Sequence, residues 1–545
     1  MRMGKKLKDL LVQSKLKRRL APAPPPPLQE DQKVEKKVWE PWELKQIPIS
    51  SSLEQNLALV KRVVEGNADF EMREFALGRG GKRAAIIFLA NMVERSQLNR
   101  QILENLMFRI PKDQKVDLDF LRDRVITVAE VCEVKDFWEV FSHVTEGCAV
   151  LLVDGENRAL GLDVRGYERR AIEEPVTEST VRGPRDGFVE DIEENIMLIR
   201  RRIRTPNLVM ERITVGRLTR SVVVLGYIKG LVNPALVEEV KKRIAQIDMD
   251  AVYGFRYVEE MIIDNPYTFF PQAICTERPD RVCGALTEGR VVILVDTSPF
   301  ALIVPASLPM LLQTPEDYYH ISGISTAIRW LRYLAFIFSV VGSPLYVAIS
   351  NYHPDMIPAR LLFSLAAARE GVPVPAALEA FMMEVAFELL REAGIRLPRQ
   401  IGQAVSIVGA LIIGEAAVRA GLVSPLMVIV VAATGIASFT VPSYELGVPM
   451  RLLRFPILFL AATLGLFGVV VGLLAILIHL AGLRSFGLPY LSPLAPLKFG
   501  ELRDVLVRAP FWAMRTRPET SKRNWFRVSP WGRSRRPEEE YRRRS

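Results

Sequence analysis

The chain has 545 residues and a formal net charge of +10, and 49% of its residues are hydrophobic. This length allows two or three folded units. The excess of Lys and Arg lies largely in the two tails of a chain whose second half is apolar, so it favours attraction to anionic lipid and no nucleic-acid partner. The four cysteines form no CxxC pair and the four histidines have no metal-ligand spacing, which indicates reduced thiols, no metal site and no cofactor.

Residues 1–50 are predicted to form a basic, proline-rich, flexible extension. Eight Lys and Arg stand against the single acid Asp9 in residues 1–19, and five prolines lie in residues 21–27. The start lacks the continuous apolar region of a secretory signal, so we expect the soluble part of the chain to stay in the cytoplasm.

A pattern of helices and strands occurs twice between residues 51 and 312. The helix predicted at 53–64 returns at 192–200, each time followed by apolar strands. We infer a duplicated α/β cytoplasmic domain with two similar subdomains, 51–170 and 188–312, joined by a linker at 171–187. The space between them is either a ligand cleft or a rigid packed interface. The apolar strands that carry the repeat are predicted at 84–89, 150–154, 222–227 and 292–296.

The glycine-rich residues 78–83 look like a phosphate-binding loop but do not fit its pattern. The first glycine of the motif would fall at Ala76, and Arg83 occupies the Ser or Thr position. The glycines lie between two predicted strands and are better explained as a hairpin turn. Since no nucleophile elbow or metal motif occurs either, we expect that the chain is not an enzyme.

From residue 313 to 497 the chain is predicted to form an all-α, polytopic membrane domain. The longest apolar run, 455–483, contains no Asp, Glu, Lys or Arg and is long enough to cross a bilayer. A basic tail at 498–545 follows. Residues 484–544 carry fifteen Lys or Arg against six acids, which favours a cytoplasmic C-terminus and an even number of crossings. The four predicted spans are 331–350, 401–418, 425–441 and 455–483, with an amphipathic helix at 376–393.

Three acidic residues of this domain are candidates for an ion path. Glu384 and Glu388 lie one helical turn apart on one face of the amphipathic helix, followed by Glu392, and Glu415 lies within a predicted span. Carboxylates beside a bilayer attract cations at a pore entrance. The alternative is a solvated helix face partly neutralised by Arg391. An acid within a span is costly, so Glu415 marks either function or the end of a helix.

Small residues recur at alternating spacings of four and three in the last span. They lie on one stripe of the predicted helix and form a single seam that permits close approach of another helix. We interpret this seam as helix packing, within the subunit or against a neighbour, and the wall of a narrow apolar pore is the alternative. The residues are Ala461, Gly465, Gly468, Gly472 and Ala475.

Several motifs follow one another in a fixed order across about residues 50–515. They are Arg185-Asp186-Gly187-Phe188, Thr276-Glu277-Arg278-Pro279-Asp280, Ala367-Ala368-Arg369-Glu370-Gly371-Val372-Pro373, Gly402-Gln403-Ala404-Val405-Ser406 and Pro489-Tyr490-Leu491-Ser492-Pro493. In these motifs the chain resembles the A subunits of the GerA-type spore germinant receptors of endospore-forming Firmicutes.

This resemblance implies a multi-pass protein of the spore inner membrane that acts with a transporter-like B subunit and a lipoprotein C subunit. It also implies a homo-oligomer of A subunits that opens in response to nutrients, bound chiefly by the B subunit, and releases monovalent cations. An accessory germination channel of the related stage V sporulation AF type and a non-conducting membrane scaffold are the alternatives.

Overall fold

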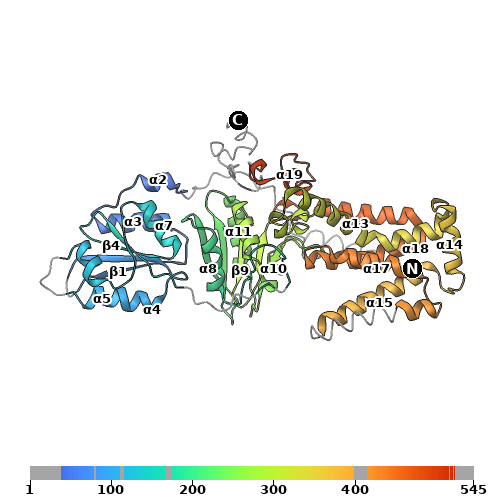
Figure 1. Cartoon of the computed structure of the whole chain (residues 1–545), viewed down its shortest axis with the longest axis horizontal. Coiled ribbons are helices and arrows are strands. Elements are labelled where there is room, and N and C mark those ends of the chain that lie inside the picture. Colours follow the sequence, from blue (N-terminus) through green and yellow to red (C-terminus); the bar gives the residue numbers. More distant parts are fainter. Residues whose placement is uncertain are drawn as a thin grey trace, which may run out of the picture.

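Two antiparallel sheets and a bundle of helices follow one another along the long axis of the molecule (Figure 1). This computed structural model describes residues 38–78, 81–110, 116–166, 174–175, 177–178, 180–397, 414–514, 516–518 and 521. The first sheet and its helices lie at one end, the second sheet lies in the middle, and the helical region forms the other end.

The first sheet has five strands in the order β1-β2-β4-β5-β3, and every neighbouring pair is antiparallel. Ala85 and Ile87 of β2 pack with α3 and α7, whereas Ala84 and Ile86 point to the opposite face and pack with η1 and α5. Both faces of the central strands are therefore covered, which explains their apolar sequence. The strands are β1 (Phe70–Ala76), β2 (Arg83–Leu89), β3 (Val131–Val134), β4 (Ala149–Val153) and β5 (Ala159–Leu162), and the helices are α2 (Pro41–Lys45), α3 (Leu53–Val63), α4 (Arg95–Gln97), η1 (Leu98–Leu103), α5 (Glu104–Phe108), α6 (Leu118–Phe120), η2 (Leu121–Val125) and α7 (Phe137–Glu146).

The second sheet also has five antiparallel strands, in the order β6-β7-β9-β10-β8. Counted from the first strand of each sheet, this is the same order as in the first sheet, which supports the interpretation of an internal duplication. The strands are β6 (Leu208–Val215), β7 (Ser221–Ile228), β8 (Ile274–Thr276), β9 (Val291–Val295) and β10 (Ala301–Val304), and the helices are α8 (Ile192–Arg202), α9 (Pro234–Ala245), α10 (Phe255–Ile262), α11 (Pro279–Thr287) and α12 (Leu308–Leu311).

The apolar strands predicted from the sequence are present as β2, β4, β7 and β9, each within one residue of its predicted bounds. Strands β1 and β2 pair antiparallel with Ala76 opposite Arg83. The two strands therefore form a hairpin, which agrees with the turn predicted from the glycines between them.

The two sheet units pack directly against each other through a buried ion pair. Arg200 of α8 donates through Nε to Asp69 Oδ2 at 2.8 Å and through a terminal nitrogen to Asp69 Oδ1 at 2.9 Å. Asp69 immediately precedes β1, and both side chains are almost completely buried. Of the two alternatives for the space between the subdomains, a packed interface is what the structure shows here.

Parts of the predicted extension and linker are folded onto the sheet units. Trp39 and Leu44 are buried, and the Asn207 side-chain amide donates to the Trp39 carbonyl at 2.8 Å. In the linker, Pro184 O and Thr180 Oγ1 accept hydrogen bonds from the buried guanidinium of Arg278 at 3.0 and 2.9 Å. The packed structure therefore begins before residue 51 and continues through residues 180–187.

The helical region begins at η3 (Pro315–Tyr318) and is dominated by two long apolar helices. Of the described residues, α13 and α18 form helices that are long and apolar enough to cross a membrane, and α17 is a shorter apolar helix. Of the predicted span at 401–418, residues 401–413 lie outside the described residues and 414–419 are helical. The main helices are α13 (Ser322–Tyr352), α14 (Ala359–Arg369), α15 (Ala376–Arg396), α17 (Pro425–Phe439) and α18 (Tyr444–Gly482).

Helix α18 is a hairpin of two helices that turns at Gly465. Gly465 has φ 63° and ψ −141°, a conformation outside the helical region that favours glycine. Both ends of α18 contact the second sheet unit: Glu445 lies 3.9 Å from Arg256, and His479 Nε2 lies 2.8 Å from Thr268 Oγ1. A straight helix of 39 residues would be about 58 Å long and could not do this.

The prediction of one continuous span at 455–483 is therefore wrong. The first arm, residues 444–464, is about 32 Å long and the second, residues 466–482, is about 26 Å long. Each arm is comparable to the hydrocarbon thickness of a bilayer, about 30 Å. The prediction used only the length and the composition of the apolar run. A reversal of the chain at a single glycine changes neither, so it could not be predicted from them.

The base of α13 is held by charged residues and by the start of the predicted tail. Arg329 and Arg332 donate to Asp317 at 2.9 and 3.1 Å. Although burial favours the neutral carboxyl, the hydrogen bonds from these arginines hold the pKa of Asp317 below its usual value. Trp330 Nε1 donates to the Leu506 carbonyl at 2.8 Å, so the segment around α19 (Leu502–Val505) packs on α13.

Candidate functional site

A network of charged side chains lies buried between α13, α15, α17 and α18. Glu384 of α15 is fully buried and forms an ion pair with the buried Arg454 of α18. Ser343 Oγ donates to Glu384 Oε1 at 2.5 Å, and Arg454 Nε donates to the Ser339 carbonyl at 2.8 Å. The network thus connects three helices in an otherwise apolar bundle.

Glu388 extends this network by one turn of α15. It lies 3.3 Å from Arg391 and 3.2 Å from Arg451 of α18. Arg391 also donates to Ser438 Oγ at 2.8 Å, and its guanidinium lies 4.5 Å from the ring centroid of Phe439. Partial burial of these groups strengthens the ion pairs relative to exposed ones.

The network contains the two carboxylates of Glu384 and Glu388 and the three guanidinium groups of Arg391, Arg451 and Arg454. Its formal charge is therefore +1, and each carboxylate is held by an arginine of α15 or α18. In this arrangement the glutamates neutralise arginines, and neither is a free ligand for a cation.

The other acidic candidates lie apart from the network. Glu392 pairs with Arg396 at 2.6 Å, and Glu415 pairs with Arg419 at 2.5 Å, each on the same helical surface one turn away. All four side chains are more than half exposed. Helix α15 thus buries Glu384 and exposes Glu392, although both lie on the face predicted from the four-residue spacing.

The small-residue seam lies mainly inside the α18 hairpin. A methyl group on Gly468 would overlap the Leu460 carbonyl oxygen of the opposite arm, and one on Gly472 would lie 3.1 Å from Ile457 Cγ1. Ala461 and Gly465 are also buried, whereas Ala475 is exposed. These glycines let the two arms approach closely, because a larger side chain has no room between them.

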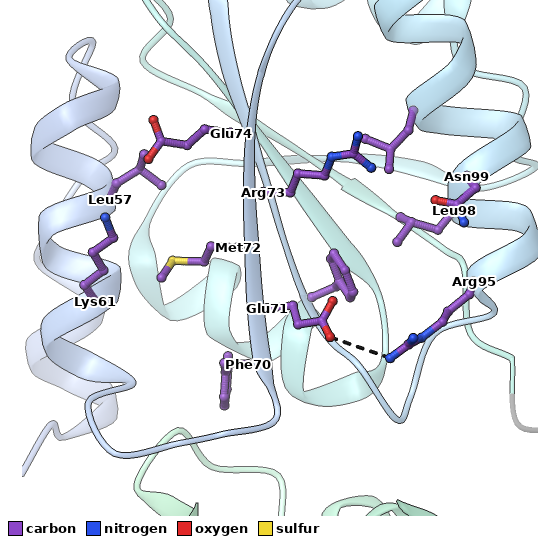
Figure 2. Close-up of a pocket in the computed structure, with 12 residues that line it drawn as sticks. Leu57, Lys61, Phe70, Glu71, Met72, Arg73, Glu74, Arg95, Leu98 and Asn99 are labelled. Carbon is purple, nitrogen blue, oxygen red and sulfur yellow. Dashed lines mark ion pairs between the residues drawn. The ribbon is translucent and has the colours of Figure 1, made fainter.

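The groove in Figure 2 lies on the first sheet unit, away from the buried network. It has a volume of about 640 Å³ and follows the edge strand β1 between α3 and η1. Lys61, Arg73 and Arg95 contribute positive charge, Glu71 and Glu74 contribute negative charge, and Arg95 pairs with Glu71 at 3.6 Å. The groove therefore has no predominant charge that would select one class of ligand.

Within the described part of the chain, no three His, Cys, Asp or Glu side chains come together as a metal site. The residues of the network that the sequence reasoning misses are Arg451 and Arg454. Arg451 and Arg454 come directly before the apolar run, where they look like its polar flank. They meet Glu388 and Glu384 across 63 and 70 residues of sequence, so no local pattern connects the partners.

Residues 58–520 match the Bacillus/Clostridium GerA spore germination protein family. The chain belongs to this family. The family resemblance predicted from the ordered motifs is thereby confirmed, because the match covers most of the chain.

Two proteins of Bacillus subtilis are similar to this chain over most of its length. "Uncharacterized membrane protein YfkQ" of Bacillus subtilis (strain 168) is 44% identical over 476 residues, which cover 87% of this chain and 92% of that protein. "Spore germination protein KA" of the same organism is 42% identical over 496 residues, 90% of each chain. A solved structure, the N-terminal domain of the A subunit of the Bacillus megaterium spore germinant receptor GerK3, is 32% identical and covers 48% of this chain and 96% of that one, with a TM-score of 0.38.

Proposed function

We propose that this chain is the membrane subunit of a nutrient-germinant receptor that triggers spore germination. Membership of the GerA family and the names of relatives such as "Spore germination protein KA" support this role. The apolar helices α13 and α18 support membrane residence. The partners are B and C receptor subunits and further copies of this chain, in the spore inner membrane with the sheet units on the cytoplasmic side.

The observation that carries a conducting role is the charged network in the helical bundle, in which Glu384 and Arg454 are buried and Glu388, Arg391 and Arg451 are partly buried. Charged side chains inside a bilayer are costly and mark functional positions. In this structure both carboxylates form ion pairs with arginines and are not available to a passing cation, so the arrangement corresponds to a closed path. Passage of monovalent cations along this network requires that Arg451 or Arg454 move away from its glutamate.

Cation release from liposomes tests this role. Complexes of the full chain with its B and C partners are reconstituted with potassium inside, and nutrient is added outside. We expect nutrient-triggered flux that changes several-fold in Glu388→Gln, which frees Arg391 and Arg451, and stays unchanged in the exposed control Glu392→Gln. Wild-type complexes that assemble and bind nutrient without flux would eliminate conduction.

A membrane scaffold is the second candidate, because the glycines of the α18 hairpin are explained by packing alone. Gly468→Leu introduces a side chain where the Leu460 carbonyl oxygen already lies. For a scaffold, this substitution dissolves the complex with no separable defect in conductance. For a channel, assembled complexes of milder hairpin variants keep their subunits and lose flux.

A further inference from the structure

One face of α13 is apolar and exposed from the first turn of the helix onward. The charged residues at this end, Arg329 and Arg332, are buried at Asp317 and do not contribute to that face. The exposed residues recur at spacings of three and four, so they lie on one side of the helix. They are Ile324, Ile328, Leu331, Leu334 and Phe338.

Residues 502–514 of the predicted tail run along the same end of α13. The Tyr333 hydroxyl donates to the Val505 carbonyl at 2.9 Å. The backbone N–H of Arg508 donates to Thr326 Oγ1 at 3.1 Å. The two attachment points on α13 are seven residues apart, so the segment follows the helix for about 10 Å. Figure 1 shows α19, at the start of this segment, where the second sheet unit meets the helical region.

The segment adds its own exposed apolar side chains to this end of α13. Trp330 connects the two surfaces, because its Nε1 donates to the Leu506 carbonyl while its ring stays exposed. A cluster of large apolar side chains in contact with water is unfavourable and marks a surface that is covered by something else. The exposed side chains of the segment are Leu506, Val507, Phe511 and Trp512.

Arg508 holds these exposed side chains in place from below. It is buried, and its guanidinium lies 4.4 Å from the ring centroid of Phe511 and 5.8 Å from that of Tyr318. A terminal nitrogen of Arg508 also donates to the Tyr318 carbonyl at 3.2 Å. The aromatic end of the segment is therefore fixed to the base of α13, with the Phe511 ring 57% exposed.

The properties of this surface fit the interface between a bilayer and water. Tryptophan and other aromatic side chains collect at that level of membrane proteins. Interfacial segments lie about 5–10 Å deep at the boundary between headgroups and acyl chains, which is comparable to the length over which the segment follows α13. The excess of Lys and Arg in residues 484–544 adds attraction to anionic lipid.

We propose that residues 502–514 lie in the interface of the cytoplasmic leaflet beside α13, with Val507, Phe511 and Trp512 in contact with phospholipid. This inference rests on the membrane residence that is part of the proposed function. It goes beyond that function, because it makes the start of the basic tail a lipid-binding segment that ties the base of α13 to the membrane surface.

Spin labels on the full-length chain in bilayers that contain phosphatidylglycerol test this placement. The exposed Cys132 is first replaced by Ser, and a nitroxide is attached at Phe511→Cys. Its collision rate with oxygen, which concentrates in hydrocarbon, is compared with its collision rate with a water-soluble nickel chelate.

Two phenylalanines of similar exposure serve as matched controls. Phe108 on the first sheet unit is 74% exposed, and Phe459 on the first arm of α18 is 69% exposed. We expect the ratio of oxygen to chelate collisions at Phe511→Cys to be several-fold higher than at Phe108→Cys and lower than at Phe459→Cys.

A second label position keeps the result interpretable. Val507→Cys leaves the contact between Phe511 and Arg508 intact, so its label decides the case if the two positions differ. A ratio at Val507→Cys equal to that at Phe108→Cys would place the segment in water and overturn the proposal. A label that is shielded from both oxygen and the chelate would overturn it as well, because a second copy or another protein then covers the surface.

The label at Phe459→Cys separates this inference from the proposed function. If it collides mainly with oxygen while the labels at Val507→Cys and Phe511→Cys collide mainly with the chelate, only the interfacial segment is wrong. If it also collides mainly with the chelate, the membrane residence of α18 is wrong, and the interfacial segment fails with it.

Discussion

Replacing Glu384 by Gln tests whether the buried network holds the helical bundle together. Glu384 and Arg454 are both almost completely buried. The amide keeps an oxygen for the hydrogen bond from Ser343, but it leaves the guanidinium without its counter-charge. Breaking a buried ion pair by removing one partner costs about 3–5 kcal/mol. With roughly 2–4 °C per kcal/mol for a large domain, the apparent melting temperature is expected to fall by about 6–20 °C.

The assay is thermal unfolding of the full-length chain in detergent, read together with cation flux from reconstituted complexes. Arg454→Met is expected to destabilise the chain by a similar amount, because it leaves Glu384 as the unpaired charge. The double variant Glu384→Gln with Arg454→Met contains neither charge and is expected to recover most of the loss. Glu392→Gln is the matched control, since its ion pair is exposed and contributes less than about 1 kcal/mol.

A specific outcome would refute this reasoning. Suppose that Glu384→Gln has the same melting temperature as the Glu392→Gln control while its cation flux changes. Glu384 then acts as a pore-lining carboxylate, and its ion pair with Arg454 contributes little to stability. If both stability and flux are unchanged, Glu384 has neither role.

Two further predictions concern the hairpin and the thiols. Gly465→Ala places a methyl group at a positive φ, 2.9 Å from the Tyr352 ring, and is expected to lower the free energy of unfolding by at least about 1–3 kcal/mol. Gly447→Ala is the control, because no atom lies within 4 Å of the added methyl group. Equal melting temperatures of the two variants would contradict the hairpin. Burial raises the pKa of the Cys148 thiol to about 11, so at pH 8 roughly one molecule in a thousand carries the reactive thiolate at this position. Iodoacetamide is expected to label the exposed Cys132 first, with Cys148 labelled as the pH rises or the chain unfolds, and mass spectrometry that finds Cys148 labelled first in folded protein would refute this.

Local patterns in the sequence predict much of the two sheet units. The strands β2, β4, β7 and β9 follow from short apolar runs bounded by turn residues. These elements are predictable because each is a central strand of its sheet and is covered on both faces, so that its sequence is a continuous apolar run. The ion pair between Asp69 and Arg200 has no such signal, since its partners lie 131 residues apart.

The candidate site was predicted only in part. The spacing of Glu384, Glu388 and Glu392 identifies one face of α15, and the helix is present. Spacing does not say which of these side chains is buried, because that depends on the helices that pack against each turn. Glu379 shares the helix but lies outside the four-residue repeat, and its hydrogen-bond donor Ser424 lies 45 residues further along the chain, so no local pattern connects them.

Composition alone already separates a half of the chain built from short strands and helices from a half built from long apolar helices. The reason is that the hydropathy of each segment indicates whether it contacts water or an apolar environment. Composition does not indicate where the chain reverses its direction within the second half. Residues 455–483 have the same composition whether they form one helix or two, and Gly465 is compatible with both. The choice depends on the contacts of Glu445 and His479 with the second sheet unit, which bring both ends of α18 to the same surface and force the reversal between them.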